Sequence, residues 1–458
     1  MSTNDRSSTG HNLLLLFIAF FGIFVYGLLT ALPGTVLPEL ERHQFLPNDA
    51  KAGTFLLINA IGAVLAYIIS GPLTDRLGKK FTLFVGSALV IGSMGGFALI
   101  VGNVPAAGAL ALIFACSLVL GLGANAIVSA GHALVGDIAA SRVNSALNLL
   151  DVCFGLGLFV LPFIAQALPH DAGLSTIFWV LAIFTAALLV LVVAPRFPRP
   201  VHPESFPIRE AGDLFLSPSF WLLAIALFMY VGTEVAVGKW VVTFLERDAQ
   251  LLSAVGIDAA RLQQMAQASP DSLTDFFKND RAGINLADFA LKTLSFFGLS
   301  LMIGRLISSF LLGVLRVGST VLLMAGSAVT TIGLAIAFNA TDPEAVRWAV
   351  VLAGIGMGPI FPTSVGLASV IVPRIAGTAM SWVMGIGFAG LLVIPPSVGY
   401  ISDKVGGQAG DVRKGLFAVL AASAIMLLLH IILAARERHR NKQQRVEVQP
   451  EVTAKAQS

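Results

Sequence analysis

The feature that most constrains this chain is a series of long apolar runs with few charged residues between them. Each run has about 20 residues or more, enough for an α-helix to cross the ~30 Å hydrocarbon core while satisfying its own backbone hydrogen bonds. The whole chain is 56% hydrophobic and 12% charged, whereas soluble domains are roughly a quarter charged. The sequence therefore predicts an all-α polytopic membrane protein with twelve transmembrane helices, at 12–38, 52–71, 81–102, 107–133, 143–168, 174–194, 219–245, 290–315, 318–339, 345–371, 375–401 and 414–435.

The charged residues between the runs predict the orientation of the chain in the membrane. An even number of spans places both termini on one side, and short cytoplasmic loops carry an excess of Lys and Arg. The segment Gly71–Lys80 has three cations, and the tail from Arg436 onward adds several more. The short loops of the opposite side carry fewer. We therefore expect a multi-pass protein of the cell (inner) membrane with both termini in the cytoplasm.

Two segments interrupt the series of spans. Pro195–Pro218 contains six prolines, which is typical of a linker. Residues 246–288 form a longer insertion, in which Asp258 is placed to cap a helix over Ala259–Gln267. This insertion is either a small solvated cap or a substrate-binding module. The predicted organisation is an N-terminal six-helix bundle (1–194), a cytoplasmic linker (195–218), a C-terminal six-helix bundle (219–435) with its external insertion (246–288), and a polar, disordered cytoplasmic tail (436–458).

The segment Gly71–Lys80, predicted to be a tight turn, carries a family resemblance. Its sequence Gly-Pro-Leu-Thr-Asp-Arg-Leu-Gly-Lys-Lys resembles the loop between the second and third helices of the major facilitator superfamily. The resemblance implies two six-helix bundles with the substrate site between them. It also implies that Asp75 docks on the helix that begins near Arg374, where the free N–H groups favour an acidic side chain. The implied gating residues are Gly71, Asp75, Arg76, Gly78 and Arg374.

Enzyme motifs are absent from the sequence. There is no H-E-x-x-H, G-x-S-x-G or Walker P-loop pattern. Gly121–Ala126 fits the dinucleotide pattern G-x-G-x-x-A, but it lies inside an apolar run with no preceding strand, so close helix packing explains it better. We expect no enzymatic activity, no cofactor, no metal site and no nucleic-acid partner.

Charged residues inside the spans indicate function, because a carboxyl at membrane depth must be paired, solvated or protonated. Glu234, Asp151 and Arg305 are such residues. From their positions along their helices, Glu234 and Arg305 lie at similar depths, within reach of an Arg side chain. The sequence predicts an ion pair between these two residues, and all three are our candidates for proton coupling.

A second resemblance narrows the class of transporter. Tyr230–Trp240 resembles the signature of the seventh helix in the fucose–proton symporter family. Similar to the same group are Ala146–Asn148 with Phe154–Gly157, and Gly358–Thr363. This implies uptake of a monosaccharide with protons, or with sodium as in the animal relatives. The fucose symporter itself uses an acidic residue in its first helix and another in its fourth. In this chain the first span has no acid between Tyr26 and Pro38, and the polar residue of the fourth span is Asn125. Coupling would therefore use Glu234 or Asp151.

The sequence thus predicts a secondary active transporter for proton-coupled uptake of a monosaccharide or similar small polar solute. Amides both donate to and accept from sugar hydroxyls, and aromatic rings can stack on a pyranose. An exporter or antiporter of small organic compounds, or a transport-inactive sensor with the same fold, remain alternatives. We expect a monomer in the lipid bilayer. The candidate substrate-binding residues are Tyr26, Asn59, Asn125, Asn148, Tyr230, Trp240 and Trp382.

Overall fold

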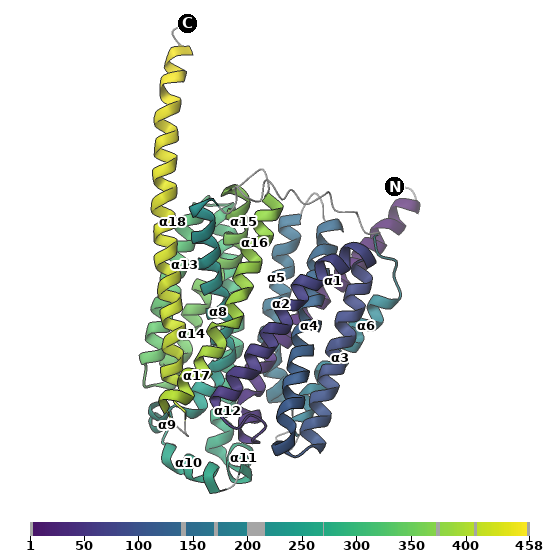
Figure 1. Cartoon of the computed structure of the whole chain (residues 1–458), viewed down its shortest axis with the longest axis vertical. Helices are drawn as coiled ribbons and strands as arrows, with labels where there is room; N and C mark the ends of the chain where they lie inside the picture. The colour runs from purple at the N-terminus through teal and green to yellow at the C-terminus, as the bar shows by residue number, and fades with distance from the viewer. Residues whose placement is uncertain are drawn as a thin grey trace.

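Helices make up nearly all of the chain (Figure 1). The computed structural model describes residues 3–138, 143–168, 173–198, 216–268, 270–371, 376–406 and 410–455, and within these ranges it contains no strand. Twelve helical segments are long and apolar enough to cross a membrane, so the predicted fold class is confirmed. The first six are α1 (Thr3–Arg42), α2 (Asp49–Leu77), α3 (Lys79–Asn103), α4 (Ala106–Ile138), α5 (Val143–Ala167) and α6 (Ser175–Val193).

The other six spans follow the Pro-rich segment, most of which lies outside the described residues. Two of the spans predicted as continuous helices, 345–371 and 375–401, are each broken in two. Pro359 and the pair Pro395–Pro396 lie at or beside the breaks. Proline interrupts a helix because it lacks an N–H group and clashes with the preceding turn. The spans are α8 (Pro218–Arg247), α12 (Arg281–Gly313), α13 (Ser319–Asn339), α14 (Pro343–Met357) with α15 (Ile360–Ile371), α16 (Ala376–Ala389) with the 3₁₀ turn η2 (Gly390–Leu392) and α17 (Ile394–Gly406), and α18 (Val412–Lys455).

The turn predicted over Gly71–Lys80 is much shorter than expected. Helix α2 continues to Leu77 and α3 begins at Lys79, so only Gly78 lies outside a helix. Gly78 has φ of 89°, a conformation that glycine adopts without steric cost, and this is why the chain can reverse within one residue. Asp75 therefore belongs to α2 and not to a loop. Its side chain lies outside the described part of the structure.

The tail and the insertion also differ from expectation. Helix α18 continues to Lys455, whereas a disordered tail was predicted from residue 436. The many Arg, Lys, Gln and Glu residues there have high helix propensity. The insertion forms three short helices, α9 (Ala249–Ala254), α10 (Ala259–Ala268) and α11 (Pro270–Asn279). The predicted N-cap of α10 by Asp258 is confirmed, because the Ala260 N–H donates to Asp258 Oδ1 at 2.9 Å.

The helices α1–α6 lie on one side of the molecule and α8–α18 on the other (Figure 1). Both chain termini lie at the same end, at the top of Figure 1, and the insertion lies at the opposite end, which we call the distal end.

Charged residues hold the two sides together at the distal end. Arg247 of α8 donates to Glu41 of α1 at 3.0 Å and to Asp49 of α2 at 2.5 Å. Asp49, 2% exposed, also accepts a hydrogen bond from Ser402 of α17. Arg42 of α1 pairs with Glu246 of α8 at 3.4 Å. We call these six residues the distal clamp, and they close this end of the molecule.

Helices α2 and α17 approach each other closely beside the clamp. A Cβ atom added at Gly53 would lie 2.7 Å from the carbonyl oxygen of Pro396, closer than real Cβ contacts come. Glycine at this position therefore permits the distal end to close.

We expect Gly53→Ala to open the distal end. Overpacking of this kind costs ~1–3 kcal/mol, which shifts the closed–open equilibrium about 5-fold or more toward open. The measurement is the rate at which a hydrophilic maleimide labels Ala52→Cys, on the face of α2 that carries Asp49, in a chain lacking Cys116 and Cys153. Gly92→Ala is the control, because nothing lies within 4 Å of a Cβ there. Equal labelling rates in the two variants would contradict the role of Gly53.

Candidate functional site

Arg305 of α12 is the centre of a polar cluster at mid-helix depth. Its Nη2 atom lies 3.8 Å from Oε1 of Glu234 on α8, and the two side chains are 10% and 12% exposed. The ion pair predicted from the sequence is therefore present. At 3.8 Å the contact is longer than a hydrogen bond, so it is an electrostatic interaction between two largely buried charges.

Helix α5 supplies further contacts to the same guanidinium. Arg305 Nη1 donates to the main-chain oxygen of Asp151 at 3.1 Å, and its Cζ lies 5.4 Å from the centre of the Phe154 ring. The carboxylate of Asp151 is near a different partner, since its Oδ1 lies 3.9 Å from Nε2 of His132 on α4. The side chain of Arg305 thus joins α12 to both α5 and α8.

Tyr26 and Asn125 extend the cluster to α1 and α4. The ring of Tyr26 stacks on Phe154 with centroids 5.5 Å apart, and its hydroxyl donates to Asn125 Oδ1 at 3.3 Å. Asn125 in turn donates to the Gly121 carbonyl at 3.0 Å. Five candidate residues therefore lie in one connected group, namely Tyr26, Asn125, Asp151, Glu234 and Arg305.

Tyr230 lies one helical turn before Glu234 on α8 and is fully buried. Its hydroxyl lies beside the polar groups of Glu234 and Arg305, although no contact there has the geometry of a well-formed hydrogen bond. Tyr230 therefore belongs to the polar cluster around Arg305.

A small cavity of about 30 Å³ lies beside Glu234, where α1, α5, α8 and α12 meet. Most of its lining is apolar, and Thr30 and Glu234 are its polar members. A cavity of this size has room for one or two water molecules, and water there would solvate the carboxyl group.

The other candidates do not join this group in the described contacts. The side-chain amide of Asn59 donates to the Ser117 carbonyl at 3.1 Å, which contributes to packing of α2 on α4. Trp240 is fully buried and donates to the Pro395 carbonyl at 2.9 Å. Trp382 on α16 is 42% exposed.

Several candidates lie beyond what the structure describes. Arg374 is outside the described residues, and the side chains of Asn148 and Asp75 are likewise undescribed. Gly71 lies within α2, and Arg76 is exposed near the end of that helix.

The sequence reasoning missed the role of Phe154 and the whole distal clamp. Phe154 follows Asp151 by three residues and so shares its helix face, a signal that could have placed it in the cluster. The charged residues of the clamp occur at the ends of spans. Their positions in the sequence therefore predict a shared depth in the membrane but do not predict which of them form ion pairs. Among the described residues no group of three or more His, Cys, Asp or Glu residues is arranged to hold a metal ion.

Comparison with known families agrees with this architecture. The family model described as Major Facilitator Superfamily matches residues 19–259 and 277–456. The chain belongs to the major facilitator superfamily. It is accordingly a multi-pass membrane transporter of that superfamily, as the stretch Gly71–Lys80 suggested.

Relatives at the sequence level are distant. The chain is 22% identical over 426 residues to Protein TsgA of Shigella boydii, a match that covers 90% of this chain and 94% of the relative. It is 21% identical over 248 residues to Bypass of stop codon protein 6 of Saccharomyces cerevisiae, and this match spans 48% of each protein.

Solved structures share the fold. A D-xylose-proton symporter superposes with a TM-score of 0.70 at 14% identity, covering 92% of this chain and 97% of the other. The fucose:proton symporter of E. coli superposes with a TM-score of 0.59 at 15% identity, covering 92% and 99%. At these identities the likeness shows the fold alone.

We expect the Glu234–Arg305 pair to be strongly coupled in stability. Removing one partner of a buried pair costs roughly 3–5 kcal/mol because a charge remains buried and uncompensated. Arg305→Met should therefore lower the melting temperature more than the double variant Arg305→Met with Glu234→Gln. Melting of purified protein in detergent measures this difference.

Lys414→Met provides the matched control. It removes an ion pair with Asp411 in which the lysine is 55% exposed, and exposed pairs contribute about 1 kcal/mol or less. If the double variant melts no higher than Arg305→Met, the two buried charges do not depend on each other.

Proposed function

We propose that this chain is a secondary active transporter that takes up a monosaccharide or similar small polar solute together with protons. The observation that carries the proposal is the buried Glu234–Arg305 pair in contact with a cluster of aromatic and amide side chains. A carboxyl that is alternately paired with Arg305 and released from it can bind and give up a proton. The names of the structural neighbours, two of which are sugar–proton symporters, support the substrate class and the coupling ion.

The substrate in this proposal binds between α1, α4, α5, α8 and α12. Tyr26 and Asn125 offer both donors and acceptors to sugar hydroxyls, and Phe154 offers an apolar ring. Asn59, Asn148, Tyr230, Trp240 and Trp382 stay candidates for contacts made in other conformations. Asp151, beside His132, is the second candidate for the proton, and sodium is the alternative coupling ion.

Alternating access in this proposal opens and closes the two ends in turn. The distal end faces outward, and the end that carries both termini faces the cytoplasm of a cell whose inner membrane holds the protein as a monomer. Gly71, Asp75, Arg76, Gly78 and Arg374 are the proposed gating residues of the cytoplasmic end. The distal clamp closes the outward end when the substrate is released inside.

Glu234→Gln should abolish uphill uptake and leave exchange of bound sugar largely intact, because exchange does not require the carboxyl to lose its proton. The measurement is radiolabelled hexose in proteoliposomes, with and without an imposed pH gradient, followed by counterflow. Glu344→Gln is the control, since Glu344 is an exposed carboxylate, 55% by side chain, at the start of α14.

Other outcomes would point elsewhere. Uphill uptake that survives in Glu234→Gln would remove this residue from the coupling mechanism. Efflux of small organic compounds against a gradient, without hexose uptake, would make the protein an exporter. No flux of any solute, with hexose binding retained, would make it a sensor.

A further inference from the structure

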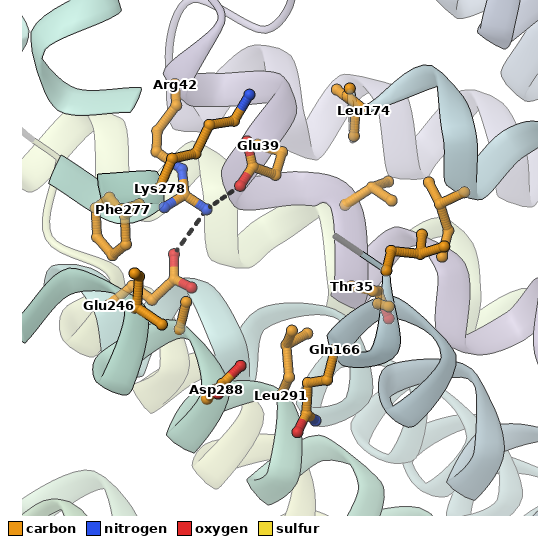
Figure 2. A pocket seen from close by; sticks show the side chains of 17 residues that line it. Thr35, Glu39, Arg42, Gln166, Leu174, Glu246, Phe277, Lys278, Asp288 and Leu291 are labelled. Carbon is orange, nitrogen blue, oxygen red and sulfur yellow. Dashed lines mark hydrogen bonds and ion pairs between the residues drawn. The ribbon is translucent and has the colours of Figure 1, made fainter. Parts of the chain in front are cut away.

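A second cavity lies at the distal end, and the proposed transport mechanism assigns no ligand to it. It has a volume of about 150 Å³ and lies between the end of α1, the end of α5, the end of α8, and α11 with the start of α12 (Figure 2). The insertion therefore forms one of its walls. Because its lining comes from both sides of the molecule, the cavity is complete only while the distal end is closed.

Arg42 is the most buried cation of this cavity, at 7% exposure. Its Nη2 atom pairs with Glu39 at 2.9 Å and Glu246 at 3.4 Å, and its guanidinium lies 3.9 Å from the centre of the Phe277 ring. Its Nε and Nη1 atoms are buried and have no hydrogen-bond partner among the described residues. Buried donors of this kind favour an added acceptor group.

Two further charged residues, of opposite sign, line the cavity. Figure 2 shows Lys278 of α11 and Asp288 of α12 on different sides of it. Within the described part of the chain, neither forms an ion pair at 4.0 Å or less. Gln166 of α5 also lines the cavity, and its buried Nε2 has no partner there.

We propose that the distal cavity binds a small zwitterionic solute of the amino-acid type. Its carboxylate would accept hydrogen bonds from Arg42 and Lys278, and its ammonium group would pair with Asp288. A neutral polyol would leave both Lys278 and Asp288 without an opposite charge, whereas a zwitterion supplies one to each. The apolar wall formed by Val36, Ile177 and Leu291 receives the remainder of the solute.

Such a ligand would act on the transport cycle. It contacts α1 and α5 on one side and α11 and α12 on the other, and so it stabilises only the state in which the distal end is closed. A ligand that binds one of two states shifts the equilibrium toward that state. The insertion is then a regulatory binding module and not only a solvated cap.

Binding is tested on the full-length purified protein by calorimetry and melting. The probes are L-alanine, L-glutamine and L-leucine, and the comparison compounds are sodium acetate, ethylamine hydrochloride and D-xylose. At least one amino acid should bind and raise the melting temperature, and acetate and ethylamine should bind at least 10-fold more weakly than that amino acid. Asp288→Asn and Lys278→Gln should each weaken amino-acid binding 10-fold or more.

Asp275→Asn and Lys292→Gln are matched controls, because both are exposed charged residues on the same two helices and neither lines the cavity. They should leave binding unchanged. Bound amino acid should also slow maleimide labelling of Ala52→Cys several-fold. These readouts do not depend on sugar uptake, so they separate this proposal from the proposed function.

Three results would overturn the proposal. The first is that none of the three amino acids binds the unmodified protein. The second is that amino-acid binding survives in both Asp288→Asn and Lys278→Gln, which would place it elsewhere in the molecule. The third is that D-xylose binds and is lost in Asp288→Asn, which would make the cavity a sugar site.

Discussion

The burial of Arg305 is the constraint on which the centre of this molecule depends. A guanidinium among apolar helices needs an opposite charge and hydrogen-bond acceptors nearby, and the partners of Arg305 come from two other helices. Glu234 of α8 supplies the opposite charge, and α5 supplies a main-chain carbonyl and an aromatic ring. The backbone of α12 also packs closely on the break between α14 and α15, because a Cβ atom added at Gly358 would lie 2.6 Å from the main-chain nitrogen of Arg305. Helix α12 can approach this closely because residue 358 has no side chain, so one charge fixes the mutual positions of several spans.

Much of this arrangement could be predicted from the sequence, and the reason is the bilayer. Hydrocarbon requires long apolar helices and tolerates few charges, so the spans and the depths of Glu234 and Arg305 follow from position along the chain. Depth alone does not specify which helices are neighbours. The contact between Tyr26 and Phe154 and the burial of Trp240 against Pro395 depend on lateral packing that no pattern within one helix encodes. The one-residue turn at Gly78 was missed because polar residues near a membrane surface can continue a helix as readily as end it.

Helix α8 links the central cluster to the distal clamp. Glu234 lies near its middle, and Glu246 and Arg247 lie at its distal end, about 18 Å away at 1.5 Å per residue. Glu234 pairs with the buried Arg305, and Glu246 and Arg247 pair with residues of α1 and α2 on the other side of the molecule. A tilt of α8 therefore changes both sets of contacts together. The proposed proton site and the closure of the distal end are in this way connected by one rigid element, with no need for a separate chain of contacts.

The turn at Gly78 has a mechanical consequence for the side of the molecule formed by α1–α6. Because α2 and α3 are separated by a single residue, there is no flexible linker that could absorb a change in the angle between them. Lys79, the first residue of α3, also forms an ion pair with Asp137 near the end of α4. A displacement of α2 that begins at Asp49 would be carried over the full length of that helix to α3 and α4. These three helices would then rotate as one stiff body, and the freedom needed for transport would lie in the contacts between the two sides.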